Sequence, residues 1–178
     1  MPRRTPTPHS SPFPSLTEGR PDKPDPTPIL LEEKRNAEGI RVILSAYGLR
    51  DPNQADRNLD AMAGDPIQRR RLADILPMMM ESISRTADPD QALNHWERML
   101  ESVSRTSFLD YLRTWPRMLD LLCVVFGSSD ALTFTFIRDP TVVYWLAEED
   151  VLARPPTRMG MERALHASIG HLTSKESK

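Results

Sequence analysis

The chain has 178 residues, of which 39% are hydrophobic, so it can bury one core of ordinary domain size. Its 23 basic and 25 acidic residues nearly balance, which argues against a general nucleic-acid binder. No stretch reaches the roughly 18 uncharged apolar residues of a membrane span, and the N-terminus lacks the apolar region of a secretory signal. We therefore expect a cytoplasmic protein that binds neither nucleic acid nor membrane.

Residues 1–28 are predicted to form a disordered, proline-rich tail. Nine of the 17 prolines fall here, and few large apolar side chains are present to offset the entropy of ordering the segment. Arg3 and Arg4 suit an organelle-targeting peptide, but so much proline would prevent the amphipathic helix that such peptides use. A plain tail is the favoured interpretation.

From residue 29 onward the prolines become sparse, and four of them follow an aspartate: Asp51-Pro52, Asp65-Pro66, Asp88-Pro89 and Asp139-Pro140. Aspartate at an N-cap accepts a backbone N–H bond, and proline in the first helical position gives up an N–H that the helix does not use. Each pair therefore predicts a helix start. Three glycines are predicted to end the preceding helices in the left-handed conformation: Gly48, Gly64 and Gly127.

The spacing of apolar residues between these marks is helical. In "QALNHWERMLESV" one stripe holds Ala92, Leu93, Trp96, Met99, Leu100 and Val103. Residues 116–126 are apolar nearly all round, which predicts a central helix covered on most sides, with Cys123 as a small buried hydrophobe. The alternation in "LTFTFI" also suits a strand, but helix marks on both sides favour a helix.

The chain also resembles itself. "DPNQADRNLDAM" from Asp51 and "DPDQALNHWERM" from Asp88 share five residues at equal offsets, 37 residues apart. Segments around Pro77, Pro116 and Pro140 all carry apolar residues two, three and six positions after the proline. Because proline inside a helix costs about 3 kcal/mol, these three sites are predicted to be helix starts. A repeat of two short helices is typical of helical arrays.

The predicted fold is thus all-α: an array of short packed helices in repeated pairs, with the disordered proline-rich tail before it. The helical domain is assigned to residues 29–154. Residues 155–178 are predicted to form one C-terminal helix that frays at its end, with an apolar stripe of Met161, Leu165, Ile169 and Leu172.

No catalytic, cofactor-binding or metal-binding residue is predicted. Gly127 and Ser128 suggest a phosphate-binding turn, but they follow an apolar helix and lack paired carboxylates on a neighbouring strand, so Ser128 or Ser129 is predicted to cap a helix. Three further groups are read as structural or solvated: the run Arg69, Arg70 and Arg71; the run Met78, Met79 and Met80; and the pair His166 and His171.

The ordered segments "DPDQALNHWERMLESV" and "LDYLRTWPRMLDLLCVVFGSSDALTFTFIRDPTVVYWL" resemble the helical leader of the glutamine-synthetase adenylyltransferases. In that family an Asp-Pro-Asp-x-Ala-Leu helix comes first, then a Pro-x-x-Leu helix ending in Phe-Gly-x-Ser, then an Arg-x-Pro helix with Trp-Leu. Here these elements are residues 88–98, 116–129 and 138–146. The resemblance covers residues 45–150.

The resemblance implies enzymes that attach AMP to glutamine synthetase and remove it, using Mg²⁺ and ATP, and that answer to glutamine and the PII signal protein. The family's Gly-Ser and Asp-x-Asp catalytic motifs lie downstream of the leader, and no such motif is found up to Lys178. The chain is therefore expected to be a non-catalytic N-terminal fragment that packs against a missing catalytic domain, or a shortened relative. The alternative is a free-standing protein-interaction module that presents an apolar patch around residues 78–80 or Trp96.

Overall fold

The computed structural model describes residues 23–34 and 36–146, and every regular element in these ranges is a helix. The helices are α1 (Pro28–Leu31), α2 (Ala37–Ala46), α3 (Pro52–Ala63), α4 (Pro66–Ile83), α5 (Pro89–Ser102), α6 (Arg105–Thr114), α7 (Pro116–Phe126), α8 (Asp130–Arg138) and α9 (Thr141–Leu146). The all-α prediction is confirmed. The segment "LTFTFI" lies in α8 and is not a strand.

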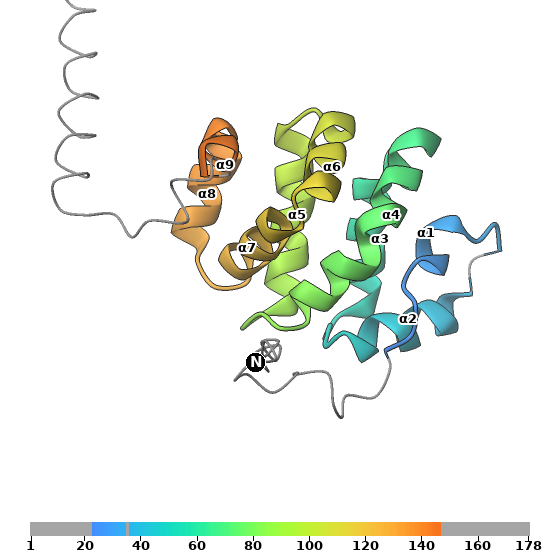
Figure 1. The fold of residues 1–178 in the computed structure, drawn as a ribbon. Coiled ribbons are helices and arrows are strands. Elements are labelled where there is room, and N and C mark those ends of the chain that lie inside the picture. The colour runs from blue at the N-terminus through green and yellow to red at the C-terminus, as the bar shows by residue number, and fades with distance from the viewer. Residues whose placement is uncertain (1–22, 35, 147–178) are drawn as a thin grey trace, which may run out of the picture.

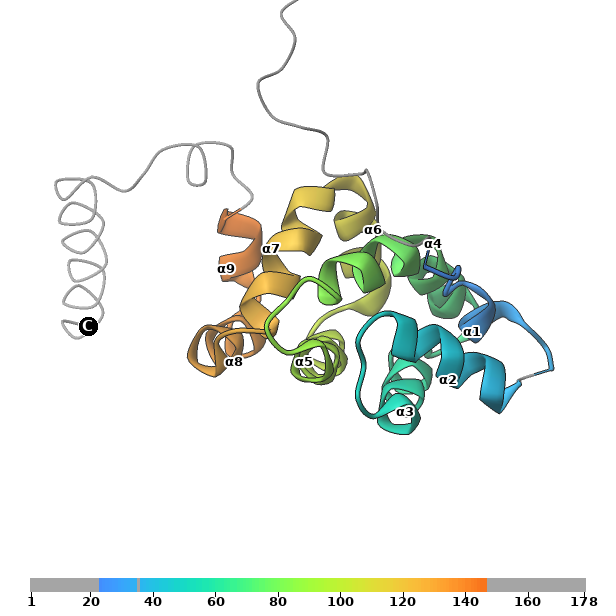
Figure 2. The same cartoon turned by 90° about the horizontal axis from the view of Figure 1, so that it is seen from below.

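The helices follow one another across the molecule in chain order, from α1 and α2 on one side to α8 and α9 on the other (Figure 1, Figure 2). α3 packs against α5, while α4 packs against α6 and α7. α5 in turn contacts α7 and α8. Each helix pair is therefore covered by the next, as expected for an array. None of the helices described is long and apolar enough to cross a membrane.

Three of the four Asp-Pro pairs start helices as predicted. The side chain of Asp51 accepts from the backbone N–H of Gln54 at 3.0 Å, and Asp88 accepts from Gln91 at 3.0 Å. Asp65 accepts from two backbone N–H groups of the first turn of α4. Asp139 also caps, but α9 begins at Thr141, one residue after the proline.

Two of the three glycines end helices in the predicted way. Gly48 and Gly64 have φ values of 85° and 59°, in the region that glycine adopts with the least strain. Gly127 ends α7 as predicted, but its φ of −90° is not the left-handed conformation, so that part of the prediction is wrong. A Cβ there would lie 2.5 Å from Thr86, so glycine is required by the close approach of two loops and not by backbone conformation.

The repeated unit is present, but its prolines behave differently. Pro116 begins α7 as predicted, whereas Pro77 lies inside α4, so the prediction of a helix start there is wrong. The apolar residues two, three and six positions after these prolines are at most 3% exposed: Met79, Met80, Ile83, Met118, Leu119 and Leu122. The pattern therefore predicted burial correctly in these two segments, even where it misplaced a helix boundary. After Pro140 only Val143 is fully buried, while Val142 and Leu146 are partly buried.

The core contains most of the predicted α5 stripe. Ala92, Leu93, Trp96, Met99 and Leu100 are at most 1% exposed, and Val103 is half-buried. The prediction that α7 is covered on most sides is wrong, because Val124 is 57% exposed, and Leu121 and Val125 are only partly buried. Neighbouring helices cover one face of α7, and nothing in the described part of the chain covers the other.

The boundary of the predicted tail falls within a segment that the structure describes. Residues 23–28 lie against α2 and α4: Pro26 is buried, and the hydroxyl of Tyr47 donates to the Pro24 carbonyl at 2.9 Å. The rest of the predicted disordered tail and the predicted helix at 155–178 lie outside the described residues.

Candidate functional site

The turn at Gly127 and Ser128 joins α7 to α8 and is occupied by its own hydrogen bonds. The hydroxyl of Ser128 donates to the Val124 carbonyl, and the Ser129 side chain accepts from the Leu132 N–H at 3.4 Å. Ser129 is therefore the predicted cap of α8. The Gly127 carbonyl accepts from the Asp88 N–H at 3.2 Å, which ties this turn to the start of α5. The turn thus serves helix packing.

The three consecutive arginines point to different partners. Arg69 forms an ion pair with Asp60 at 3.5 Å, and Arg71 forms one with Asp110. Arg70 is exposed. Because two of the three guanidinium groups are paired on different neighbouring helices, the run does not form one anion-binding cluster.

The apolar patch proposed for a free-standing module is not on the surface. Met79, Met80 and Trp96 are fully buried, and Met78 is packed against the core, so the prediction of a partner surface here is wrong. These side chains are large and apolar, and they fill the space between α4, α5 and α7. Cys123 is buried with them, and burial raises the pKa of its thiol to about 12, so the group is unreactive.

The predicted histidine pair, His166 and His171, and the acids at 148–150 lie outside the described residues. Among the residues that are described, no group of three histidine, cysteine or acidic side chains is arranged to hold a metal ion.

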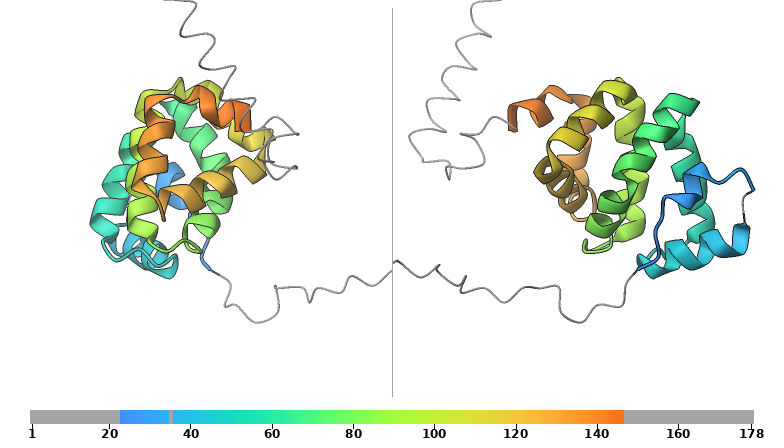
Figure 3. Two further views of the ribbon diagram at one scale, coloured as in Figure 1. Left: turned by 90° about the vertical axis from the view of Figure 1, so that its left-hand side faces the viewer. Right: turned by 45° about the vertical axis from the view of Figure 1, so that its right-hand side comes forward.

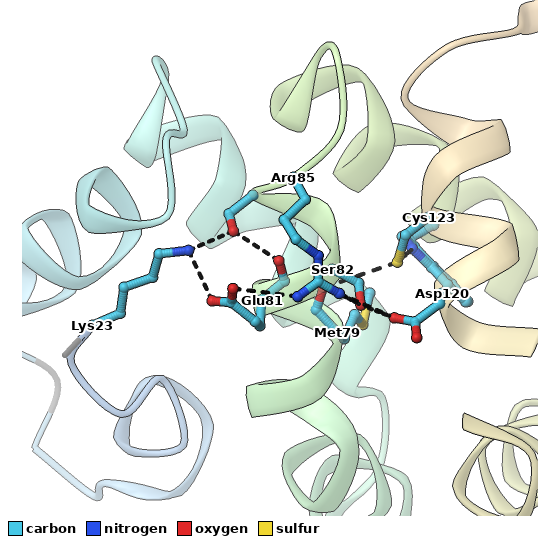
Figure 4. A network of polar contacts seen from close by, with 9 residues as sticks. Lys23, Met79, Glu81, Ser82, Arg85, Asp120 and Cys123 are labelled. Atoms are coloured by element: carbon cyan, nitrogen blue, oxygen red, sulfur yellow. Dashed lines mark hydrogen bonds and ion pairs between the residues drawn. The ribbon is translucent and has the colours of Figure 1, made fainter. Parts of the chain in front are cut away.

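A polar network joins the N-terminal segment, α4 and α7 (Figure 4). Lys23 bonds to Glu81 at 2.8 Å and to the Ser84 hydroxyl, and its ammonium lies 5.0 Å from the centre of the Tyr47 ring. Arg85 contacts Glu81 at 3.3 Å. Opposite charges and an aromatic face thus hold the segment before α1 against the body of the array.

On its other side the same network reaches α7. The Ser82 hydroxyl donates to the Asp120 carboxylate, which Arg85 also approaches at 3.4 Å. Asp120 is exposed and makes only solvated pairs, so the network's role is to fasten helices together.

Among the described residues, a hollow in the surface lies between α3 and α5. Two adjoining hollows of about 300 and 570 Å³ share Arg50, Gln54, Asn58, Asp90 and Asn94. This groove is the candidate binding site, because it collects polar side chains from both copies of the repeated unit.

Carboxamides form a hydrogen-bonded chain along this groove. Gln54 donates to Asn58 at 2.7 Å, and Asn58, which is only 6% exposed, donates to Asn94 at 2.6 Å. His95 closes one end: its Nδ1 lies 2.8 Å from the Phe126 carbonyl, and its Nε2 lies 3.5 Å from Asp130. The His95 ring therefore links α5 to the α7–α8 turn.

The charges at the other end of the groove are paired. Arg50 contacts Asp88 at 2.7 Å and Asp90 at 3.0 Å. The N–H of Gln91 and the Arg50 guanidinium hold the pKa of Asp88 below its ordinary value. Burial raises the pKa of Asp90, but N–H groups of Arg50 and Asp51 outweigh it, so that pKa is lowered too. The groove can bind polar groups, and the lowered pKa values of Asp88 and Asp90 keep these two acids ionised.

Sequence reasoning missed this groove. Asn94 was read as one of the polar residues beside the apolar stripe of residues 92–103, and no role was predicted for Asn58 or His95. The signal was present, because Asn58 and His95 stand on equivalent turns of the two repeated helices, where most inward positions are apolar. Buried polar side chains at such positions require partners: Asn58 donates to Asn94 across the repeat, and His95 bonds to the Phe126 carbonyl.

Comparison with known proteins gives one consistent similarity. The chain matches bifunctional glutamine synthetase adenylyltransferase/adenylyl-removing enzymes from Xanthobacter autotrophicus, with 31% identity over 136 residues, Corynebacterium glutamicum, with 26% over 145, and Streptomyces avermitilis, with 34% over 101. These matches cover 72%, 78% and 54% of this chain but only 13%, 14% and 10% of those proteins. No family model and no solved structure matches the chain.

Proposed function

We propose that this chain, which is similar to bifunctional glutamine synthetase adenylyltransferase/adenylyl-removing enzymes, is a non-catalytic helical N-terminal part of such an enzyme. It acts either as a segment of a longer protein or as a shortened relative. The single observation that carries the proposal is the match to several such enzymes over 54–78% of the chain. The proposed role is to support an adenylyltransferase that regulates glutamine synthetase by reversible AMP transfer in the cytoplasm.

The local chemistry supports a non-catalytic role. The hydroxyl groups of Ser128 and Ser129 are engaged in helix bonds, and the acids that follow them in the sequence, Asp130 and Asp139, lie at the starts of two different helices. A nucleotidyltransferase site needs two carboxylates close together to hold Mg²⁺ and a triphosphate. In our proposal Mg²⁺ and ATP are bound by a separate catalytic domain, and glutamine synthetase and the PII signal protein are the partners of the whole enzyme.

The proposal is tested by a chimera. In the Xanthobacter autotrophicus enzyme, the segment that matches this chain is replaced by the corresponding residues of this chain. We expect the chimera to transfer labelled AMP from ATP to glutamine synthetase, and we expect a deletion of the segment to lose that activity. A chimera carrying Leu76→Asp, which places a charge in the core, is the matched control for folding. A chimera as inactive as the deletion would contradict the proposal.

A second test of the proposal uses the chain alone. With glutamine synthetase, labelled ATP and Mg²⁺ present, we expect no AMP on the synthetase above the level without the chain. AMP transfer by the chain alone would show that it is an enzyme in its own right, and the non-catalytic assignment would then be wrong.

A further inference from the structure

The two ends of the helical array differ in how well their apolar side chains are covered. Among the described residues, nine large hydrophobic side chains are exposed, and six of these follow α6: Trp115, Val124, Leu132, Phe134, Tyr144 and Trp145. Several more in the same helices are only half-buried, namely Leu121, Val125, Ile137, Val142 and Leu146. Partial burial is therefore concentrated in the last three helices.

These helices form one end of the molecule. Viewed from that end, α8 and α9 lie in front and α7 lies beside them (Figure 3, left). Phe134 contacts His95 of α5 and Tyr144 contacts Tyr111 of α6, so the rings of Phe134 and Tyr144 are partly covered. Val124, Leu132 and Trp145 are 57%, 50% and 54% exposed. We call the surface of these last three side chains and the half-buried residues around them the end surface.

An apolar helix that is open to water on one side normally has a neighbour. The sequence of α7 is largely apolar, but its outward side carries the exposed Val124 together with the charged side chains Arg117 and Asp120. In a helical array each unit buries its apolar face against the next unit, so the last unit needs a cap. Exposed apolar patches on a folded domain mark a surface that is covered by something else.

The chain itself contains a segment of suitable chemistry and reach. Residues 157–172 carry Met161, Leu165, Ile169 and Leu172, which fall on one stripe at helical spacing. Residues 147–156 separate this segment from α9, and ten residues can span up to about 33 Å when extended. This is several times the diameter of about 10 Å of one helix, so the segment can fold back over α7–α9.

We propose that residues 157–172 bind the end surface as an amphipathic helix and cap the array, with their apolar stripe against Val124, Leu132 and Trp145. The occupant is thus a segment of the same chain, not a second copy or another protein. The inference does not rest on the proposed function, because it concerns only how this chain completes its own core.

Hydrogen exchange of the full chain tests the inference. We expect amides of residues 157–172 to exchange at least tenfold more slowly than in an unstructured peptide. Leu165→Asp, which places a charge on the stripe, should abolish this protection and accelerate exchange in α9. The matched control is Ala167→Asp, which adds the same charge on the opposite side of the helix and should leave the protection in place.

Three outcomes would overturn the inference. Unprotected amides in the unmodified chain would show that the segment does not bind. Equal effects of the two aspartate variants would show that the stripe is not the contact. Protection that rises with protein concentration, together with a dimer in sedimentation, would assign the end surface to a second copy. None of these results bears on AMP transfer by the chimera, so the two proposals fail separately.

Discussion

Pro77 and Pro116 occupy equivalent places in the two copies of the repeated unit, yet only Pro116 separates two helices. Pro77 lies within α4, which runs unbroken from Pro66 to Ile83, whereas Pro116 follows α6 and starts α7. The residues that precede the two prolines also differ, both in burial and in backbone conformation. Leu76 is fully buried in a helical turn, while Trp115 is 45% exposed with φ −122° and ψ 73°.

The difference shows that packing decides what a proline does. A proline inside a helix costs about 3 kcal/mol, because it removes one hydrogen bond and crowds the preceding turn. In α4, buried apolar side chains stand on both sides of Pro77, and each contributes about 1.5 to 3 kcal/mol to stability. One unbroken helix buries them all, which outweighs the cost. Trp115 is 45% exposed, so burial of this side chain does not oppose the extended backbone that the residue before a proline prefers.

The largest expected effect compares the residues that precede the two prolines. Leu76→Ala should lower the free energy of unfolding by about 3 kcal/mol, because it leaves a cavity in a fully packed site. Trp115→Ala should lower it by about 1 kcal/mol, because that ring is nearly half exposed. Urea denaturation followed by circular dichroism gives both values. Equal losses would mean that the two sites are equally packed, against the comparison above.

The second comparison replaces the prolines themselves. Pro77→Ala should raise the free energy of unfolding by about 1 kcal/mol, since it restores a backbone N–H inside α4 and the exposed ring loses little burial. Pro116→Ala should lower it by a few tenths of a kcal/mol, roughly, because proline suits the first position of a helix. The same denaturation experiment shows whether the two changes in the free energy of unfolding have opposite signs. If both variants shift stability in one direction, the two prolines are not distinguished by their packing.

The smallest expected effect is the difference in stability between variants of the two aspartates that start the repeated units. Asparagine also caps helices, so Asp51→Asn and Asp88→Asn both keep the cap, but only the second loses the ion pair with Arg50. At neutral pH Asp88→Asn should therefore cost about 0.5 kcal/mol more than Asp51→Asn, as is usual for a solvated ion pair. Denaturation midpoints of the two variants, measured side by side, give the difference.

Measuring stability at low pH makes this test more specific, because the pKa of folded Asp88 lies below its ordinary value of 3.8. Its contribution to stability is present above that value and is lost as the pH falls through the lowered pKa, where the folded carboxylate must also take up a proton. Asp88→Asn should flatten the fall in stability below pH 3.8. Parallel curves for the variant and the unmodified chain would show that Asp88 does not contribute.

Local signals predicted the fold class and most helix starts. Asp51, Asp65 and Asp88 cap helices because a short carboxylate reaches its own backbone, which needs no distant neighbour. The apolar residues two, three and six positions after Pro77 and Pro116 were expected to be buried for the same reason, since helical spacing alone puts them on one face. The resemblance to the adenylyltransferases was also readable from ordered short motifs, and it is confirmed.

The groove between α3 and α5 was not predictable in the same way. Its floor depends on Asn58 meeting Asn94 across two helices, and on His95 meeting the α7–α8 turn. The sequence shows that these side chains are polar but not which distant groups they reach. Gly127 is a similar case. Its φ of −90° is accessible to any residue, and glycine is needed there only because Thr86 lies so close.

The sequence by itself determined that this chain is helical, where most helices begin and which stripes they bury, because capping and helical periodicity act within a few residues. Only the tertiary structure decided that Pro77 is held inside a helix, that Asn58 meets Asn94 across two helices, and that no described helix covers the outer side of α7. These outcomes depend on which helices come together, and the free energy of burying apolar surface between them exceeds the local cost of a proline.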